Sequence, residues 1–388
     1  MPGDGIGKIV LEETQRILDA AGFKADYINA DIGWDFWRTE GNPLPDRTIN
    51  LLARHKIGLF GAITSKPKEE AAEELAPSLL GKGLVYSSPI VGLRQHFNLD
   101  VCIRPCRTYK GNPLNFIRKG PNNTVEEPEI DVVIFRQNTE GLYGGVEWSD
   151  PPQSVYEALL SHPKFQKNFS NVPKAELAVS TRIFSVGATK RILLAAFEYA
   201  SKYHYRSVTV CEKPNVIRET SGLMFRLAKE IQKSRFSEIE LWNTNIDAQM
   251  MWLTKNPEDY GVIVAGNMFG DIVSDGFAGL IGGLGFACSA NIGDEVAVFE
   301  PTHGSAPKYA DYPVGIVNPI AMVESACMML DHLGENDIAN RIRSAIGRVV
   351  SHGEARTYDM LKLTGRQEVL QKGAASTTEM ANAIIAAL

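Results

Sequence analysis

Two aspartates in the C-terminal half of the chain have the type and spacing of metal ligands. Asp271 and Asp275 lie four residues apart in the segment Asn267–Phe286, just after the apolar run Tyr260–Ala265. If a helix begins at Gly270, both carboxylates lie on one face, one turn apart, where they suit a hard divalent cation that shares a chelating substrate. Acidic residues at the start of a solvated helix give the same pattern, because they interact favourably with the helix dipole. This segment alone leaves both interpretations open.

Two further motifs accompany the aspartates. The chain begins with Pro2-Gly3-Asp4-Gly5-Ile6-Gly7, and Glu300–Pro307 reads EPTHGSAP. In order and spacing, these motifs and NMFGDIVSD resemble the decarboxylating β-hydroxyacid dehydrogenases (isocitrate, isopropylmalate, homoisocitrate and tartrate dehydrogenases) over essentially the whole chain. No strand–GxGxxG–helix unit with an acidic residue about 20 residues further on is found. The resemblance implies an α/β, two-lobed isopropylmalate/isocitrate dehydrogenase-like fold, not the classical Rossmann fold.

Composition limits the class of protein. The 388 residues contain 44% hydrophobic and 22% charged residues, which indicates a globular α/β protein with a sizeable core. The net charge of -6 disfavours nucleic-acid binding, and five cysteines without CxxC pairs favour buried free thiols. No membrane-spanning run or signal peptide is visible, which favours the cytoplasm. Because the chain begins inside its first motif, a mitochondrial location stays an alternative.

The resemblance also implies a domain organisation. Residues 1–98 and 283–388 would form a large cofactor-side domain, and residues 99–282 a small domain with metal, substrate and dimer contacts. A Pro- and charge-rich stretch at Ser149–Lys174 interrupts the α/β pattern, and the resemblance implies a clasp-like arm there, about 144–182, that pairs with a second subunit. Hydrophobic periodicity predicts helices at Lys8–Ala21, Thr189–Tyr203 and Ser221–Ile231. Short apolar runs predict strands at Val132–Phe135, Val208–Cys211 and Val262–Ala265. The residues Ser376–Glu379 have the pattern of a capping box before a last helix.

Three arginines have the positions expected for binding a small tricarboxylate, which needs several planar guanidinium forks. Arg94, Arg104 and Arg136 are spaced like the substrate arginines of the family that the chain resembles. Ser88 precedes Arg94 by six residues, where isocitrate dehydrogenases place a serine that bonds the distal carboxylate. A single arginine beside a strand end is more often a surface ion pair, so the interpretation depends on all three together with the aspartate motif.

The residues near these arginines disagree about the substrate. Ile90 stands where isocitrate dehydrogenases have an asparagine, and the run YSSPIVGLR resembles fungal homoisocitrate dehydrogenases. Tyr143–Trp148 instead resembles the isocitrate enzymes. One methylene is worth only about 0.8 kcal/mol, so shape and polar placement must decide between the two substrates. We expect isocitrate, with homoisocitrate or another 3-carboxy-2-hydroxy acid as the alternative.

The resemblance assigns the catalytic groups. Tyr143 would be the general acid and Lys213 the general base on the substrate hydroxyl. Asp247 would join Asp271 and Asp275 on Mg²⁺ or Mn²⁺. Because Lys213 and Asp247 come from the neighbouring subunit in this family, the expected protein is a homodimer with shared active sites. A non-catalytic regulatory subunit, which would normally have lost some of these residues, is disfavoured.

The cofactor prediction depends on the residue after Ser-Ala-Pro. An aspartate there would accept from the ribose 2′-hydroxyl of NAD and repel a 2′-phosphate. This chain has Lys308-Tyr309, with Tyr358 and Lys362 later, a set that favours NADP over the alternative NAD. The loop Ala310–Val317 is two residues longer than in NADP-dependent relatives. The predicted cofactor-binding residues are Glu300, His303, Gly304, Lys308, Tyr309, Asn318, Tyr358 and Lys362.

Overall fold

A computed structural model describes all 388 residues and contains one mixed sheet of eight strands, in the order β1-β12-β11-β2-β5-β10-β8-β9. The last four strands are parallel, whereas β11 is antiparallel to β12 and β2, and β2 is antiparallel to β5. The three strands predicted from apolar runs lie within β5, β8 and β10. In sheet order the strands span Ile57–Leu59, Ala297–Pro301, Cys288–Ile292, Val101–Arg107, Asp131–Gln137, Val262–Ala265, Ser207–Glu212 and Glu240–Asn245.

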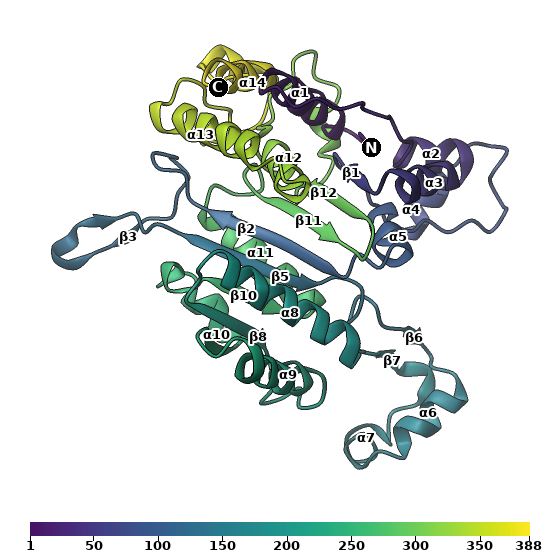
Figure 1. Cartoon of the computed structure of the whole chain (residues 1–388). Helices are drawn as coiled ribbons and strands as arrows, with labels where there is room; N and C mark the ends of the chain where they lie inside the picture. Colours follow the sequence, from purple (N-terminus) through teal and green to yellow (C-terminus); the bar gives the residue numbers. More distant parts are fainter.

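Helices cover both faces of the strands β5, β10 and β8, whose residues are nearly all buried. On one side lie α8 (Val186–Lys202) and α9 (Thr220–Arg235), and on the other lie α10 (Ile246–Trp252) and α11 (Asn267–Leu280) (Figure 1). Strands covered on both faces read as continuous apolar runs, which is why these were recognisable in the sequence. Helices α8 and α9 lie within a few residues of their predicted positions.

The chain termini come together at the other end of the sheet. Helix α12 (Ile320–Leu333) covers β11 and β12, and α1 (Gly7–Ala20), α13 (Asn336–His352) and α14 (Thr377–Ala386) pack around it (Figure 1). The predicted capping box is present. The Ser376 hydroxyl accepts from the Glu379 amide at 3.1 Å, and the Glu379 carboxylate accepts from the Ser376 amide at 2.8 Å.

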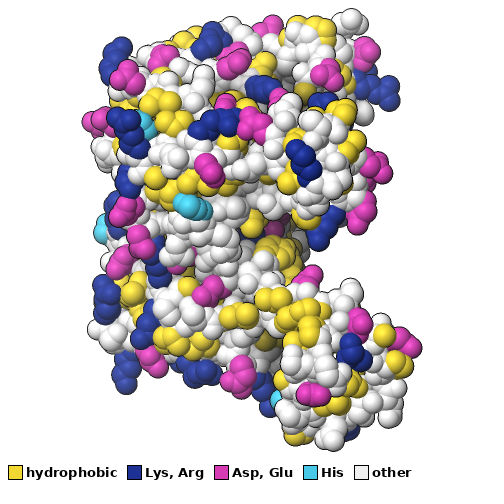
Figure 2. Space-filling view, turned by 90° about the vertical axis from the view of Figure 1, so that its right-hand side faces the viewer, with side chains coloured by type: hydrophobic (Ala, Val, Ile, Leu, Met, Phe, Trp, Pro, Cys, Tyr) yellow, Lys and Arg dark blue, Asp and Glu magenta, His cyan; other side chains and the backbone are white.

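Four short helices lie near β1, and two excursions leave the body. The helices are α2 (Trp34–Glu40), α3 (Asp46–His55), α4 (Lys68–Glu73) and α5 (Pro89–His96). One excursion is the hairpin of β3 (Arg118–Lys119) and β4 (Val125–Glu126). The other, which we call the arm, stands out from the body in Figures 1 and 2. The arm consists of β6 (Glu147–Ser149) and β7 (Ala178–Ser180), paired antiparallel, with α6 (Gln153–Leu160) and α7 (Pro163–Phe169) between them.

Two sequence predictions need comment. The helix that carries the aspartates begins at Asn267, so the expectation that Gly270 opens it is wrong by three residues. Gly270 is needed for close packing instead, because a Cβ atom there would lie 2.8 Å from the Arg136 side chain. The two-lobed division stays a prediction, since one sheet runs through both segments.

All five cysteines are free and buried. No helix is both long and apolar enough to span a bilayer.

Candidate active site

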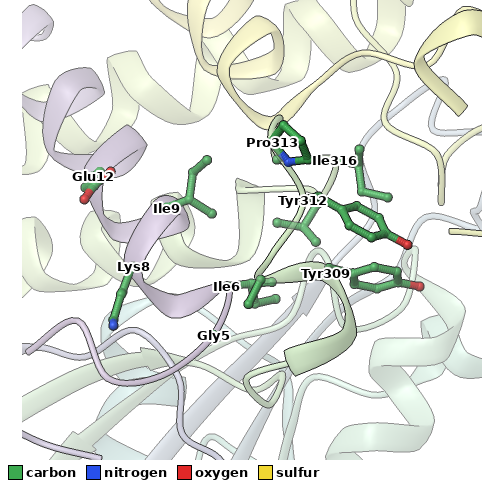
Figure 3. Close-up of a pocket in the computed structure, with 12 residues that line it drawn as sticks. Gly5, Ile6, Lys8, Ile9, Glu12, Tyr309, Tyr312, Pro313 and Ile316 are labelled. Atoms are coloured by element: carbon green, nitrogen blue, oxygen red, sulfur yellow. The ribbon is translucent and has the colours of Figure 1, made fainter. Parts of the chain in front are cut away.

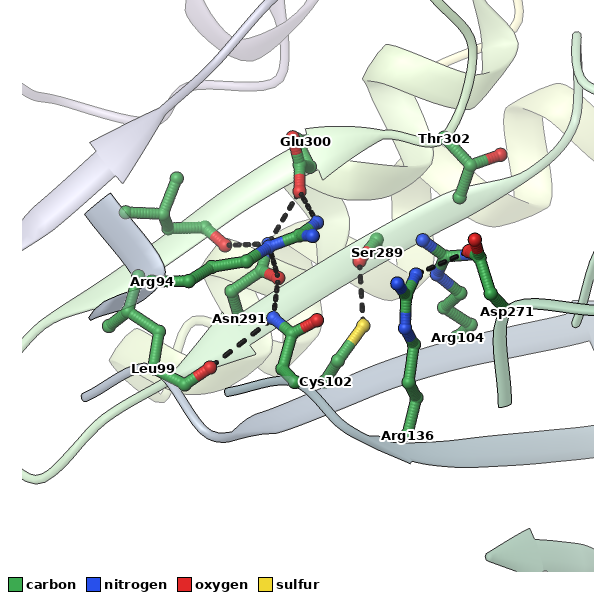
Figure 4. Close-up of polar contacts among 12 residues, drawn as sticks. Arg94, Leu99, Cys102, Arg104, Arg136, Asp271, Ser289, Asn291, Glu300 and Thr302 are labelled. Atoms are coloured by element: carbon green, nitrogen blue, oxygen red, sulfur yellow. Dashed lines mark hydrogen bonds and ion pairs between the residues drawn. The ribbon is translucent and has the colours of Figure 1, made fainter. Parts of the chain in front are cut away.

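Two of the predicted arginines and two of the predicted aspartates form one group, which we call the arginine–aspartate cluster: Arg104, Arg136, Asp271 and Asp275. Arg104 on β2 and Arg136 on β5 are two positions apart in the antiparallel register, so both side chains face α11. Arg104 Nη1 lies 3.1 Å from Asp271 Oδ1 and 3.4 Å from Asp275 Oδ1, and it donates to Ser274 Oγ at 2.7 Å. Arg136 also pairs with Asp271 (Figure 4).

The cluster has side chains that could still bind an anion and others that could bind a cation. The arginine side chains are only 8% and 4% exposed, whereas those of Asp271 and Asp275 are 33% and 58% exposed. The buried Nε of Arg104 has no hydrogen-bond partner, so a carboxylate could satisfy it. Burial, followed by repulsion from Arg104, lowers the pKa of Arg136 to about 10. Burial raises the pKa of Asp275. The open carboxylates beside the guanidinium groups could hold a cation next to an anionic substrate.

Arg94 lies apart from the other two arginines. It donates to Glu300 at 2.9 Å and to Asn291 at 3.2 Å, and Asn291 in turn donates to Glu300 at 2.8 Å and accepts from Asn138 at 2.8 Å (Figure 4). All of these side chains are buried. The predicted cofactor residue Glu300 therefore neutralises the predicted substrate residue Arg94 in this structure.

Helix α5 carries Arg94, and Ser88 directly precedes its first residue. Ser88 is the N-cap residue, but its side chain makes no capping bond. Ile90 is buried in the same apolar group as Leu93, and it lies one turn before Arg94 on the same face of the helix. At helical spacing, Val91, which is 46% exposed, lies between Ser88 and Arg94. The buried apolar neighbour of Arg94 on this helix is thus Ile90, the residue that stands where isocitrate dehydrogenases have an asparagine.

The predicted acid and base occupy different surroundings. The Tyr143 ring lies over Arg136, with 5.8 Å between the guanidinium carbon and the ring centroid, and the tyrosine is 55% exposed. Partial burial, followed by the negative charge of Asp271, raises the pKa of Tyr143. Lys213, which follows β8, instead pairs with Asp247 on α10.

Asp247 lies away from the arginine–aspartate cluster. No group of three or more His, Cys, Asp or Glu side chains is placed to hold a metal ion within the chain. Its bond from Lys213 lowers the pKa of Asp247, which is therefore ionised at neutral pH. The structure brings together two of the three predicted metal ligands, and the third would have to come from elsewhere.

Three of the predicted cofactor residues are in contact. Lys308 Nζ lies 4.6 Å from the centroid of the Tyr309 ring, and that ring is 5.6 Å from the ring of Tyr358. Burial raises the pKa of Tyr309, but the bonds from Tyr358 and Lys308 outweigh it and leave the pKa below its ordinary value. Lys362 is exposed, in a turn with φ of 56°. The long loop Ala310–Val317 forms one wall of a pocket of about 200 Å³ whose other wall is the start of α1 (Figure 3).

The remaining cofactor residues follow β12. His303 Nδ1 lies 3.0 Å from the Gly304 carbonyl oxygen, and its Nε2 is buried without a partner. Burial lowers the pKa of His303, so the ring is neutral and could bond a ribose hydroxyl. Asn318 accepts from the Ile320 amide at 3.0 Å and donates to Asp359 at 3.3 Å. The orphaned nitrogen and the lysine–tyrosine group fit a dinucleotide.

Sequence reasoning missed several polar residues that hold the arginines. Asn267 accepts from Arg136 Nε at 3.0 Å, and Ser274 accepts from Arg104. Both lie one turn from Asp271 on α11, so helical spacing within the aspartate motif could have indicated them. Asn291 had no such signal, because Arg94 and Asn138, which donate to it, are 197 and 153 positions away in the sequence.

Comparison with known proteins places the chain in context. Residues 1–384 match the family model described as isocitrate/isopropylmalate dehydrogenase. The chain is similar to Protein DlpA of Legionella pneumophila, with 38% identity over 99% of this chain, which spans 57% of that protein. It is 37% identical to a homoisocitrate dehydrogenase of Methanocaldococcus jannaschii, covering 89% of this chain and 87% of that one. For an NADP isocitrate dehydrogenase of Archaeoglobus fulgidus, the identity is 32%, with 99% and 90% covered.

A solved structure agrees with these relationships. The crystal structure of isocitrate dehydrogenase from Methylococcus capsulatus superposes with a TM-score of 0.81 at 32% identity, covering all of this chain and 97% of that one. The predicted fold class is therefore confirmed.

Proposed function

The chain belongs to the isocitrate/isopropylmalate dehydrogenase family, and we propose that it is a metal-dependent NAD(P) isocitrate dehydrogenase that forms 2-oxoglutarate and carbon dioxide. Members of this family are decarboxylating dehydrogenases that generally use a divalent metal and NAD(P). The observation that carries the proposal is the arginine–aspartate cluster, where buried guanidinium groups lie directly beside open carboxylates.

The arginines would bind the substrate carboxylates. Arg104 has a free buried Nε, and Arg136 lies beside it on the neighbouring strand. Both are held from behind by Ser274 and Asn267, which leaves the guanidinium planes oriented for bidentate contacts. Ser88 and Arg94 on α5 would contact the distal carboxylate. Arg94 would then exchange part of its contact with Glu300 for the substrate.

Tyr143 and Lys213 would move the protons. A nicotinamide bound beside these residues would supply the hydride acceptor, and a divalent cation held by Asp271 and Asp275 would supply stabilisation of the negative charge that forms on the substrate. Lys213 Nζ would take the hydroxyl proton, and Tyr143 Oη would protonate the carbon that loses carbon dioxide. The raised pKa of Tyr143 keeps its hydroxyl protonated at neutral pH, as an acid requires.

We also propose that two subunits share each active site. Within one chain, Asp247 pairs with Lys213 and does not form a metal-binding group with Asp271 and Asp275. Near Asp247 on α10, Met251 and Trp252 are 46% and 42% exposed. Large apolar side chains on a surface are typical of a buried interface, so α10 of one subunit would place Asp247 beside Asp271 and Asp275 of its partner. The arm would add further contacts between the subunits.

NADP is the cofactor that the residues support best. Tyr309 is in contact with both Lys308 and Tyr358, so a cation and two hydroxyl groups lie close together. This set suits a 2′-phosphate. His303 would contact the ribose through its unpartnered Nε2.

Homoisocitrate is the second candidate substrate, for a specific reason. Ile90 rather than a polar residue lies one turn before Arg94 on α5, and an apolar side chain there would tolerate one more methylene. A panel of isocitrate, homoisocitrate and isopropylmalate, each tested with NADP and NAD at a fixed Mg²⁺ concentration, separates the candidates by kcat/KM. If no member of the panel is turned over with either cofactor, the proposal is wrong.

A further inference from the structure

A second buried charge pair lies beside the catalytic residues and takes no part in the chemistry proposed above. Glu212 is the last residue of β8, directly before Lys213, and its side chain is fully buried. One carboxylate oxygen accepts from Arg182 at 2.7 Å and from the Ser221 hydroxyl at 2.6 Å. The other accepts from the Gly266 amide at 2.8 Å. A fully buried carboxylate is costly unless every lone pair is used, and here three donors converge on it.

These donors come from the elements that carry the proposed catalytic groups. Gly266 is the N-cap residue of α11, which holds Asp271 and Asp275 in its next turns. Ser221 lies in the first turn of α9, and its hydroxyl oxygen also accepts from the Lys213 amide at 3.3 Å. A negative charge at the start of α11 also interacts favourably with the dipole of that helix. The Glu212 carboxylate thus connects the start of the metal-site helix with the backbone of Lys213.

Gly266 shows how closely α11 is held. Its φ of −64° is accessible to any residue, so the backbone conformation does not require glycine. A Cβ atom there would lie 2.6 Å from Glu212 Oε1 and 2.7 Å from the Phe184 ring. The glycine is needed because the helix start approaches the carboxylate so closely.

Arg182 extends this connection to the arm. It lies just after β7, where the arm returns to the body, and it also donates to Thr220 and Ser221 at 3.1 and 3.0 Å. Its guanidinium carbon is 4.6 Å from the centroid of the Phe184 ring and 5.0 Å from that of Phe269 in the first turn of α11. The pair therefore joins the arm, β8, α9 and α11 at one point.

We propose that Glu212, paired with Arg182, is a positioning residue that fixes the start of α11 relative to the backbone at Lys213. The inference depends on the proposed function, in which Asp271 serves a chain's own active site and Lys213 serves its partner's. Since strand side chains alternate, Glu212 lies on the same face as Val208 and Val210, toward α9. Lys213 lies on the opposite face, where it pairs with Asp247 on α10. One buried pair would then align both Asp271, which serves the subunit's own active site, and Lys213, which serves the active site of the partner.

The test is Glu212→Gln in the full-length protein, with Arg182→Lys as the matched control that keeps the charge pair. The proposal predicts that the KM for Mn²⁺ rises about tenfold or more in Glu212→Gln, the range seen when groups that orient metal ligands are lost. The KM for the dinucleotide should change less than about twofold, because four strands separate β8 from β12 in the sheet. Arg182→Lys keeps the charge but loses the bonds to Thr220 and Ser221, so its KM for Mn²⁺ should lie between wild type and Glu212→Gln.

A second readout does not depend on turnover. Hydrogen exchange at the Gly266 amide should be faster in Glu212→Gln and close to wild type in Arg182→Lys, because the first variant weakens the acceptor of that amide. If the wild type turns over no substrate of the panel, the proposed function fails, whereas the exchange experiment still tests whether Glu212 holds α11.

A variant with one buried charge left unpaired risks misfolding. Glu212→Gln combined with Arg182→Met removes both charges and restores electrical neutrality. A folded double variant with a raised KM for Mn²⁺ and an unchanged KM for the dinucleotide supports the proposal. A double variant with wild-type KM for Mn²⁺ and wild-type exchange at Gly266 overturns it, because Glu212 would then be only a structural residue.

Discussion

Two groups of site residues differ in how the fold holds them. The arginine–aspartate cluster takes residues from β2, β5 and α11, and its guanidinium groups are buried and multiply bonded. The pair of Lys213 and Asp247 lies at the surface, with side chains 22% and 68% exposed, and each is the other's ion-pair partner.

This difference distinguishes residues that the folded chain needs for stability from residues that it does not need. A buried guanidinium must have partners, so the cluster also serves the stability of the chain. An exposed ion pair contributes little to stability because water screens it. Folding therefore gives no strong reason for a lysine and an aspartate at this surface, beside the exposed side chains of Met251 and Trp252. A role completed by a second subunit does give one.

The largest expected effect tests whether Lys213 serves the active site of a second subunit. Lys213→Met and Tyr143→Phe should each lower kcat by roughly 10²–10⁴-fold, because each removes a proton-transfer group. Mixing the two inactive proteins and allowing the subunits to exchange should restore about a quarter of wild-type activity. Half of the dimers would then be mixed, and each mixed dimer has one intact site.

Activity is measured before and after exchange, and each variant exchanged with itself is the control. If the mixed sample stays as inactive as either parent, Lys213 and Tyr143 serve the same subunit, and the shared site is wrong.

The second prediction concerns the cluster. A chelator should abolish turnover and Mg²⁺ or Mn²⁺ should restore it, because the two open carboxylates require a cation between them and the substrate. Asp271→Asn should raise the metal concentration needed for half-maximal activity by more than the roughly 10–100-fold typical of residues that only orient metal ligands. A metal titration of kcat measures this effect. Full activity in chelator would exclude a metal role for the cluster.

The third prediction concerns the cofactor residues. A charge-assisted bond to the 2′-phosphate is worth about 1.5–3 kcal/mol, so Lys308→Asp with Tyr309→Ile should lower kcat/KM for NADP by at least about tenfold. The value for NAD should change much less, because specificity is a difference between two affinities. The ratio of kcat/KM for the two cofactors is the measurement. A wild type that prefers NAD, or an unchanged ratio in the double variant, would make Lys308 an ordinary surface lysine.

The smallest expected effect is on stability. Asp247→Asn should leave the unfolding midpoint in denaturant unchanged while it abolishes activity. Arg136→Met should destabilise the protein by roughly 1–3 kcal/mol, since it removes a buried guanidinium and its bond to Asn267, although Asp271 keeps Arg104 as a partner.

The pH dependence gives a further check on the stability prediction. Because Lys213 lowers the pKa of Asp247 from 3.8, the little stability from this pair is present above pH 3.8 and is lost as the pH falls. Wild type and Asp247→Asn should therefore differ even less in acid. A large loss of stability in Asp247→Asn at pH 7 would show that the pair is structural.

Local sequence patterns predicted much of the fold and part of the site. The apolar runs of β5, β8 and β10 and the periods of α8 and α9 identified these elements, because each pattern reflects the environment along one segment. The spacing of Asp271 and Asp275 likewise places both carboxylates on one face wherever the helix begins. The error of three residues at the start of α11 therefore did not affect the site.

Pairings between distant residues could not be read in the same way. Arg94 pairs with Glu300, 206 positions away, rather than joining Arg104 and Arg136, although all three arginines looked alike in the sequence. Ile90 is buried whereas the next residue, Val91, is 46% exposed, a difference set by the packing of α5. The three donors to Glu212 come from separate elements. A sequence shows which donors and acceptors exist, but their partners depend on which elements pack together, because a buried polar group bonds whatever the folded chain brings within reach.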